Sequence, residues 1–529
     1  MTLSNSARGL VLLLCGIILT APTLGRATPI TDTAWARIYS SPGNAPDVPA
    51  DVKLDPAGNV YVTGRTPIAG QGLDYATLKY DPNGVLLWDE LYNGPASDVD
   101  SVTALWVDGA GNVYVTGGSV GTTSSYDFAT LKYDTDGNLL WERRYNGPAN
   151  LADRAMGLFV DPAGNVYVTG HSWGLGSGPD YATIKYDASG TQQWVKRYSF
   201  TLNGQDSARV VEVDADGNVY VTGTSYDPTT LYDIATLKYN SAGGLLWSQR
   251  YHGTGGIDDR PYDMTLDENG NVYVTGVSWS FGTRDDYVVL KYDTDGNLLW
   301  DRLYDGTGSR NDLARVIKVD AAHNVYVTGG SDGPSPFFDD MTTLKYDPDG
   351  NLLWDRRYDG PFGGDDAIGF GLHVDAAGKV YVGGYSDSVV TDFTALIYDS
   401  DGALTSVRRF NDAAFSDDMA YAMAVDDDGF IHLTGVSNPA GQTDFSTVKF
   451  IPCACAFQSD IDEDGYITPI DLARVIDIIY TGGFDPQDPA CPSTRFDFDC
   501  DGFVTVLDLT GVVDYLYDGG PGPCDPCVP

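Results

Sequence analysis

The chain has 529 residues, of which 42% are hydrophobic and 20% charged, a composition that supports a large folded core and excludes an intrinsically disordered protein. Its 74 acidic residues outnumber the 32 basic ones, so the formal net charge is −42. A surface of this sign repels phosphate backbones and anionic lipid headgroups, so neither nucleic acid nor a membrane surface is an expected partner. Five of the acidic residues are Glu and the other 69 are Asp, which favours turns and cation sites over helices.

The N-terminus has the features of a secretory signal peptide. Arg8 precedes an apolar run from Leu10 to Leu19, and Gly25 and Ala27 are small residues suited to positions −3 and −1 of a cleavage site. The run is too short to span a bilayer comfortably, and the sequence contains no other long apolar run. We therefore expect residues 1–27 to be a signal peptide, the mature protein to be secreted or held at the cell surface, and no membrane span.

After this leader, one unit repeats eight times. The string Val-Tyr-Val-Thr-Gly recurs at a spacing of 53 residues, and two looser copies follow. The eight copies start at Val60, Val113, Val166, Val219, Val272, Val325, Val380 and Ile431. A period of this size is typical of supersecondary units that are stacked or arranged in a ring.

Each unit contains four segments of alternating apolar residues, which predict four short strands. In one copy these are Met156 to Asp161, Asn165 to Gly170, Tyr181 to Asp187 and Gln193 to Tyr198. Four antiparallel strands per repeat predict a propeller blade. The series opens with a fourth strand, Trp35 to Tyr39, and closes with a third, so we expect the N-terminal strand to complete the last blade and remove a free sheet edge.

The expected fold class is therefore mainly β, an eight-bladed propeller over residues 28–452. The recurring Val-Asp-x-x-Gly-Asn-Val-Tyr-Val-Thr-Gly and Ala-Thr-Leu-Lys-Tyr-Asp strings resemble the SBBP-type beta-propeller repeats of exported bacterial proteins. The family name implies seven blades, and our count of eight departs from it. The resemblance implies no single activity.

Aspartates recur at two positions of the predicted blades. One set opens the third strand, and the other precedes the first strand. The sets are Asp74, Asp127, Asp180, Asp233, Asp286, Asp340, Asp392 and Asp444, and Asp47, Asp100, Asp153, Asp206, Asp259, Asp312, Asp366 and Asp418. A ring of carboxylates can bind cations or a basic partner. The same side chains can instead accept loop N–H groups or pair with a nearby Arg, and recurrence in every blade favours this structural role.

The aromatic side chains of the repeats have two expected roles. The Trp and Tyr of each fourth strand are expected to pack between blades. The less regular loop aromatics are better candidates for a ligand surface: Trp173, Trp279, Phe281, Phe337 and Phe338.

Residues 453–529 have a different composition and contain two calcium-type loops. In each loop carboxylates occupy positions 1, 3, 5 and 12, Gly occupies position 6, and position 7 offers a backbone carbonyl, as in an EF-hand. The expected ligands of two calcium ions are Asp460, Asp462, Asp464, Tyr466 and Asp471 in the first loop and Asp497, Asp499, Asp501, Phe503 and Asp508 in the second. An apolar stripe at helical spacing follows each loop.

Two such halves, 37 residues apart, resemble a type I dockerin domain, a small α-helical module that docks onto cohesins in the presence of calcium. By that resemblance the eight aspartates are the calcium ligands. Dockerins usually read their partner with hydroxyl residues at loop positions 10 and 11, where this chain has Pro469 and Ile470, then Val506 and Leu507. The expected partner is a cohesin-type protein or the propeller itself.

Six of the seven cysteines also lie in this region: Cys453, Cys455, Cys491, Cys500, Cys524 and Cys527. An even number in an exported chain predicts three disulfides, whose pairing the sequence leaves open. The alternative is a zinc site built from Cys453, Cys455, Cys524 and Cys527.

These features favour a secreted, non-catalytic binding or scaffold protein. The propeller is expected to be the recognition surface and the dockerin-like module a calcium-dependent tether, with a link to polysaccharide degradation or cell-surface assembly, and a glycan as a possible ligand, implied by resemblance. The alternative is a propeller enzyme, a hydrolase or lyase acting on glycans. We assign no catalytic residue and no cofactor besides calcium, because the histidines share no blade position and catalysis needs asymmetric, cooperating groups.

Overall fold

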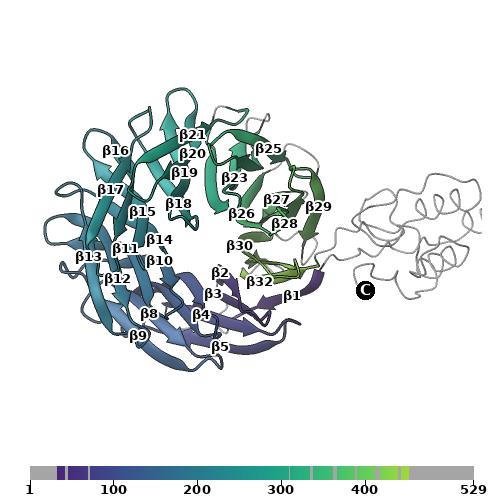
Figure 1. Ribbon diagram of the computed structural model, residues 1–529. Helices are drawn as coiled ribbons and strands as arrows, with labels where there is room; N and C mark the ends of the chain where they lie inside the picture. Colours follow the sequence, from purple (N-terminus) through teal and green to yellow (C-terminus); the bar gives the residue numbers. More distant parts are fainter. Residues whose placement is uncertain are drawn as a thin grey trace, which may run out of the picture. The chain divides into compact units, whose positions relative to one another are not determined.

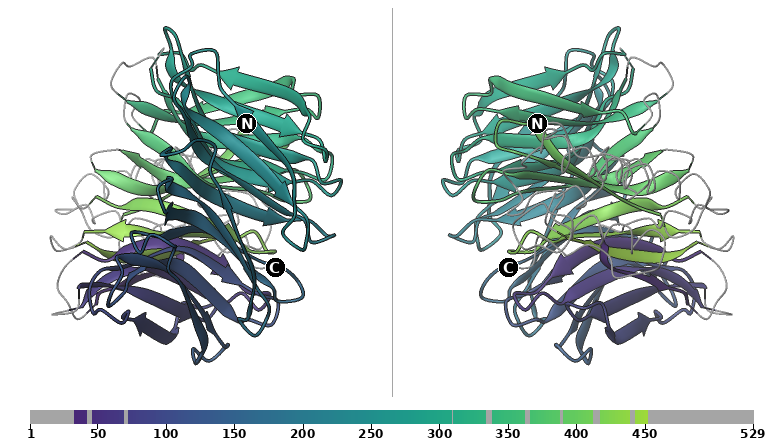
Figure 2. Two further views of the ribbon diagram at one scale, coloured as in Figure 1. Left: turned by 90° about the vertical axis from the view of Figure 1, so that its left-hand side faces the viewer. Right: turned by 90° about the vertical axis from the view of Figure 1, so that its right-hand side faces the viewer.

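The computed structural model describes residues 33–451 apart from 42–45, 69–71, 309, 334–337, 362–365, 388–389, 412–416 and 439–442. These residues form 32 strands in eight four-stranded antiparallel sheets, arranged as blades around a central axis (Figure 1). Figure 2 shows from two sides that each sheet is twisted. Among the described residues, no helix has the length and apolarity needed to cross a membrane.

The first strand of each blade is innermost and the fourth is outermost. Blade 1 comprises β2 (Val48–Leu54), β3 (Val60–Ile68), β4 (Gly72–Tyr80) and β5 (Leu86–Tyr92). Blade 2 comprises β6 (Asp100–Val107), β7 (Val113–Val120), β8 (Tyr126–Tyr133) and β9 (Leu139–Tyr145). Blade 3 comprises β10 (Arg154–Val160), β11 (Val166–Gly174), β12 (Gly178–Tyr186) and β13 (Gln192–Tyr198). Blade 4 comprises β14 (Asp206–Val213), β15 (Val219–Asp227), β16 (Leu231–Tyr239) and β17 (Leu245–Tyr251).

The other four blades follow the same order. Blade 5 comprises β18 (Asp259–Leu266), β19 (Val272–Ser280), β20 (Arg284–Tyr292) and β21 (Leu298–Tyr304). Blade 6 comprises β22 (Leu313–Val319), β23 (Val325–Asp332), β24 (Asp339–Tyr346) and β25 (Leu352–Tyr358). Blade 7 comprises β26 (Ala367–Val374), β27 (Val380–Asp387), β28 (Thr391–Tyr398) and β29 (Leu404–Phe410). Blade 8 comprises β30 (Met419–Val425), β31 (Ile431–Ser437), β32 (Asp444–Phe450) and β1 (Thr33–Tyr39).

The first strand of the chain completes the last blade, as the sequence predicts. β1 pairs antiparallel with β32, with Trp35 opposite Lys449 and Tyr39 opposite Phe445. A buried cluster that includes Trp35 and Phe445 then joins blade 8 to Val52 and Val60 of blade 1. The eight-bladed, mainly β propeller with an N-terminal closing strand is confirmed. The predicted signal peptide and the residues 453–529, with their calcium loops and cysteines, lie outside the described residues.

The repeated Asp-x-x-Gly-Asn string forms the turn between the first and second strands. In blade 1, Oδ1 of Asp55 accepts the backbone N–H groups of Ala57 and Asn59, each at 2.9 Å. Its Oδ2 accepts the Asn59 side chain at 2.7 Å and the Tyr61 hydroxyl at 2.9 Å. Gly58 takes a φ of 78°, which glycine adopts without strain. One carboxylate thus satisfies the turn and anchors the Tyr of the second strand.

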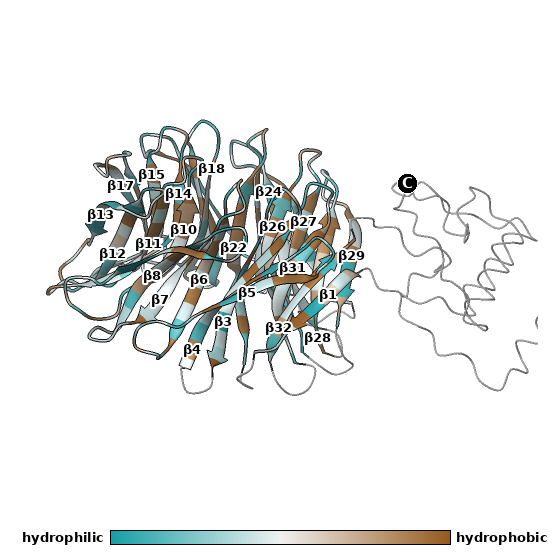
Figure 3. Ribbon diagram, turned by 90° about the horizontal axis from the view of Figure 1, so that it is seen from below, coloured by the Kyte–Doolittle hydropathy of each residue, from teal (hydrophilic) through white to brown (hydrophobic). Residues whose placement is uncertain are grey.

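Adjacent blades are held together by a hydrophobic cluster and by side chains that reach the next blade. Eight buried clusters each combine residues of two neighbouring blades, so the core is continuous around the ring. Figure 3 shows apolar residues along the strands and polar residues in the connecting turns. Between blades 1 and 2, both Lys79 Nζ and Trp88 Nε1 donate to the carbonyl of Thr135, at 2.9 and 3.1 Å. The fourth-strand Trp therefore packs between blades, as expected.

Every innermost strand carries a β-bulge at the same position, opposite the glycine of Val-Tyr-Val-Thr-Gly. In blade 4 the register shifts between Ala208 and Val210, so Arg209 is the extra residue, and Gly223 faces Ala208. A Cβ on Gly223 would lie 2.2 Å from the carbonyl oxygen of Ser207. Since only glycine fits there, the repeated glycine permits the bulge and the bulge re-aims one side chain per blade.

The second and third strands are longer than the sequence indicates. In blade 3 the pairing continues from Gly170–Ala182 to Gly174–Gly178, so most of the predicted loop from His171 to Pro179 is a strand hairpin. Gly178 has a φ of 81° at the end of this hairpin. Polar residues at the outer ends of these strands weaken the alternating pattern without ending the strand.

We predict that Gly223→Ala destabilises the propeller by about 1–3 kcal/mol, the usual cost of forcing a methyl group into a packed site. The backbone carbonyl that the new Cβ meets cannot move without breaking the bulge. Denaturant unfolding of the full chain measures the loss. Gly109→Ala is the matched control, because a Cβ at Gly109 has no atom within 4 Å. Equal stability of the two variants would contradict this account of the repeated glycine.

Candidate functional site

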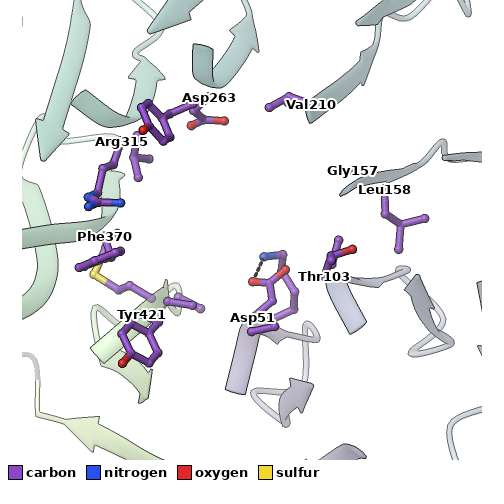
Figure 4. A pocket seen from close by; sticks show the side chains of 18 of the residues that line it. Asp51, Thr103, Gly157, Leu158, Val210, Asp263, Arg315, Phe370 and Tyr421 are labelled. Atoms are coloured by element: carbon purple, nitrogen blue, oxygen red, sulfur yellow. Dashed lines mark hydrogen bonds and ion pairs between the residues drawn. The ribbon is translucent and has the colours of Figure 1, made fainter. Parts of the chain in front are cut away.

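The axis of the propeller holds a cavity of about 920 Å³, lined by the innermost strands of all eight blades. We call it the channel. Each lining strand begins where a blade follows its predecessor. It ends at a short turn, which is Asp-x-x-Gly in seven blades and Asp320 to His323 in blade 6, so one end of the channel opens on the interblade connections and the other on the short turns. Figure 4 shows that side chains from several blades point toward its centre.

The bulged position of every blade faces this channel, and its residue differs from blade to blade. In blade order these residues are Ala50, Thr103, Met156, Arg209, Tyr262, Arg315, Phe370 and Tyr421. The first three are small or uncharged. The last five form what we call the arginine–aromatic arc: Arg209, Tyr262, Arg315, Phe370 and Tyr421. The backbone of the ring repeats regularly, whereas the side chains that the bulges present to the channel differ from blade to blade.

Contacts between neighbouring blades order the arc. The guanidinium carbon of Arg209 lies 4.8 Å from the ring centre of Tyr262, and its Nε donates to the Tyr262 carbonyl at 3.2 Å. The guanidinium carbon of Arg315 lies 4.4 Å from the ring centre of Phe370, and Phe370 packs edge-on against Tyr421 at 5.9 Å. Each guanidinium is thus held against an aromatic ring of the following blade.

The two arginines of the arc disfavour each other's charge. Desolvation lowers the pKa of Arg209, whereas Tyr262 and Asp263 oppose this change and the charge of Arg315 adds to it. The Nε of Arg315 is buried and makes no hydrogen bond within the described part of the chain. Donors in this state favour an anionic ligand in the channel.

The whole channel is less acidic than the chain. Its lining carries five cationic side chains, Lys53, Arg65, Arg209, Arg315 and Lys318, and three carboxylates, Asp51, Asp263 and Glu212. Asp51 and Asp263 serve the backbone: Asp51 accepts the N–H groups of Val52 and Leu105 at 2.8 and 3.2 Å, and Asp263 accepts those of Met264 and Ile317 at 2.9 and 3.0 Å. Each therefore links its own blade to the next.

Glu212 is a channel carboxylate whose pKa is raised. Desolvation raises its pKa to about 8, the charge of Lys318 opposes the change, and the charge of Asp263 adds to it. Lys53, Glu212, Lys318 and His373 occupy equivalent positions next to the end of their strands. The end of the channel near the short turns therefore has ionisable groups, and the arc lies further inside.

The recurring aspartates have the structural role that their recurrence favours. Those before the first strand accept loop N–H groups: Asp153 accepts from Gly147 and Trp173, at 2.5 and 3.0 Å. Those of the third strand pair with an Arg of the fourth strand in five blades. The pairs are Asp127–Arg144, Asp180–Arg197, Asp233–Arg250, Asp340–Arg357 and Asp392–Arg409. In blades 1, 5 and 8 this arginine is replaced by Leu91, Leu303 and Ile38.

The loop aromatics lie outside the channel. Trp173 lines two depressions of about 470 and 390 Å³ at the edge of blade 3. Phe281 is 77% exposed and packs edge-on against Trp279 at 4.9 Å. Phe337 is outside the described residues, and the carbonyl of Phe338 accepts from Gly333. The sequence-based candidates therefore do not form one surface.

The channel residues were not among the candidates that sequence reasoning selected. The signal that marks them is variation: the residue four places before the last strand residue differs in type across the aligned repeats, whereas the residue before it stays small or apolar. The expected calcium ligands, Asp460 to Asp508, lie beyond the described residues, so their geometry stays a prediction.

Comparison with known proteins agrees with the fold. The model of the SBBP beta-propeller repeat matches residues 246–282, which span the outermost strand of blade 4 and part of blade 5. None of the curated proteins matches the chain.

Solved structures resemble the chain at low identity. An ancestral GH74 enzyme is 15% identical, with 77% of this chain and 55% of that chain covered and a TM-score of 0.42. Drosophila Plexin A in complex with Semaphorin 1b is 10% identical, covering 82% and 89%, with a TM-score of 0.41. The beta-propeller domain of the Trilobed protease from Pyrococcus furiosus is 9% identical, covering 66% and 92%, with a TM-score of 0.38.

Proposed function

We propose that this chain is a non-catalytic binding protein that recognises an acidic ligand in the channel of its propeller. The observation that carries the proposal is the arginine–aromatic arc, in which Arg209 and Arg315 face one cavity and the Nε of Arg315 has no hydrogen-bond partner among the described residues. An anion between these guanidinium groups relieves their mutual repulsion and satisfies the free donors.

The aromatic members of the arc narrow the class of ligand. Tyr262, Phe370 and Tyr421 offer ring faces and edges beside the guanidinium groups. A chain of sugar rings that carry carboxylates matches both features, because the rings pack against aromatic surfaces and the carboxylates pair with arginine. We therefore propose an acidic glycan, which extends the link to polysaccharides expected from the C-terminal resemblance.

The two terminal segments of the chain are proposed to direct secretion and to tether the protein to a partner. Residues 1–27 would direct secretion, and the loops that contain Asp460 to Asp471 and Asp497 to Asp508 would fold around two calcium ions. A dockerin-like module of this kind would tether the propeller to a cohesin-type partner, or dock against the propeller itself, within a cell-surface or polysaccharide-degrading assembly. The motifs of the sequence support this part of the proposal.

We predict that the full chain binds polygalacturonate and that Arg315→Ala weakens binding about 10-fold or more, the effect of losing one charge-assisted contact. Arg209→Ala should act in the same direction. Calorimetric titration measures both. Lys196→Ala, on the outermost strand β13, is the control and should bind like the wild type. Binding of neutral glucan with equal affinity, or unchanged binding by both arginine variants, would contradict the proposed ligand class.

The tether predicts a calcium-dependent partner. The full chain, used as bait on a secreted and envelope fraction, should capture a partner in calcium and release it in chelator, because the ligand carboxylates repel one another without the ion. Asp462→Asn combined with Asp499→Asn should abolish capture in calcium. Arg315→Ala should leave it intact, since that residue is in the propeller. Capture that survives the chelator would refute calcium-dependent tethering.

One observation favours a second candidate, a glycan hydrolase. The raised pKa of Glu212, about 8, keeps the carboxyl protonated at neutral pH beside Asp263, as a general acid requires. In that case turnover on a polysaccharide panel should fall as pH rises through about 8, because the acid loses the proton that it donates. Glu212→Gln should abolish turnover, while Glu90→Gln on the outermost strand β5 should not. The binding proposal instead expects no turnover at any pH.

A further inference from the structure

Several interfaces between blades bring two carboxylates together. The third-strand aspartate of one blade lies near the aspartate that begins the next blade: the charge of Asp127 contributes to a raised pKa of Asp153, after burial, and Asp233 acts in the same way on Asp259. In blades 2, 3, 4, 6 and 7 a fourth-strand arginine supplies the balancing charge at 2.5–3.3 Å from the third-strand aspartate. A buried carboxylate without such a partner is costly.

Blade 5 lacks this arginine and has an extra carboxylate. Leu303 stands where the other blades have Arg144, Arg197 or Arg250, and it is 39% exposed, so it does not fill the vacated position. Asp305 follows the outermost strand, at a place where most blades have Ser, Asn or His. Oxygens of Asp286, Asp305 and Asp312 lie within 4.8 Å of one another, the one such group of three acidic, His or Cys residues among the described residues.

The carboxylate of Asp286 is the unsatisfied member of this group. The residue is 4% exposed, and its Oδ1 is buried with no hydrogen-bond partner in the described structure, as is Oδ1 of Asp127, Asp180 and Asp233. Its Oδ2 accepts the Thr283 hydroxyl at 3.0 Å, whereas Oδ2 of those three residues also accepts an arginine. Arg357 of blade 6 is engaged with Asp340 and with the hydroxyl and carbonyl of Ser331. No guanidinium of either blade therefore pairs with Asp286 among the described residues.

We propose that Asp286, Asp305 and Asp312 bind a hard divalent cation, Ca²⁺, in the place that an arginine takes in blades 2, 3, 4, 6 and 7. Carboxylate-only donors suit Ca²⁺, and its bonds of about 2.3–2.6 Å let two ligand oxygens stand up to about 5 Å apart, which covers the observed spacing. Mg²⁺ needs a tighter octahedron at about 2.0–2.1 Å. This site is separate from the channel and from the predicted C-terminal loops.

Blade 1 also has a leucine in place of the fourth-strand arginine, but it lacks a third carboxylate. Leu91 replaces the arginine, and both oxygens of Asp74 are buried without partners, facing Asp100. Burial raises the pKa of Asp74 to about 7, so a proton can neutralise this pair. In blade 5 three carboxylates share the site, so one proton cannot neutralise them all. A divalent cation balances them better.

The test measures Ca²⁺ stoichiometry by equilibrium dialysis at pH 7.5, with Ca²⁺ as the probe. The full chain carries Asp462→Asn and Asp499→Asn, which weaken the predicted C-terminal loops. Leu303→Arg restores the guanidinium and should remove one bound ion per chain. It should also abolish the rise in melting temperature that Ca²⁺ produces in the parent, and leave the ion-free protein at least as stable.

Two controls separate ion binding from folding. Leu91→Arg makes the same change in blade 1 and should leave the Ca²⁺ stoichiometry unchanged. Asp286→Asn should also lose one ion, whereas Asp127→Asn, whose parent residue pairs with Arg144, should lose none. If Leu303→Arg does not fold, the Ca²⁺ stoichiometry of Asp286→Asn tests the proposed site instead. A parent that binds no Ca²⁺ in the propeller, or an ion retained in Asp286→Asn, would overturn the site. Replacing Ca²⁺ by Mg²⁺ should give weaker binding, and equal binding of both ions would refute the stated selectivity.

Discussion

A backbone contact on which the structure depends recurs in all eight blades: the repeated glycine of the second strand lies against a carbonyl oxygen of the first. A Cβ at these eight positions would come within 1.9–2.4 Å of that oxygen. Only glycine allows this approach, and the approach allows the bulge beside it. Because the bulge is made by backbone, the side chain that it presents to the channel is free to vary. The repeat thus fixes the geometry of the bulge but not the type of side chain that faces the channel.

Contacts between blades also recur from one repeat to the next. The Lys and Trp of one blade donate to a turn carbonyl of the next, as Lys79 and Trp88 do to Thr135, and the turn is itself organised by an aspartate. Each repeat therefore satisfies the polar groups of its neighbour. β1 covers the outer edge of β32 and completes the fourth strand of blade 8, so the last blade contacts the first as the other blades contact one another.

The fold was predictable because its signals are local and repeated. The spacing of Val-Tyr-Val-Thr-Gly gives the blade count, the Asp-x-x-Gly turns divide the strands, and the fourth-strand start at Trp35 predicts the closure. The channel was not predictable in the same way. Strand side chains alternate with a period of two, and a bulge resets that alternation, so the pattern alone does not tell which residue of β14 or β22 points to the axis. Arg209 and Arg315 looked like ordinary polar residues of half-buried strands.

Departures from the repeat are where specific chemistry is to be sought in a ring of similar units. Two departures from the repeat gather electric charge, one positive and one negative. The arc gathers positive charge on the axis of a chain whose net charge is −42. The exchange of arginine for Leu303 leaves negative charge between two blades. Neither feature is needed to build a blade, because other blades form the same sheets with Ala50 or Thr103 at the bulge and with an arginine in the outermost strand. Residues that the scaffold does not require, but that gather charge of one sign around one point, are best explained by a ligand of the other sign.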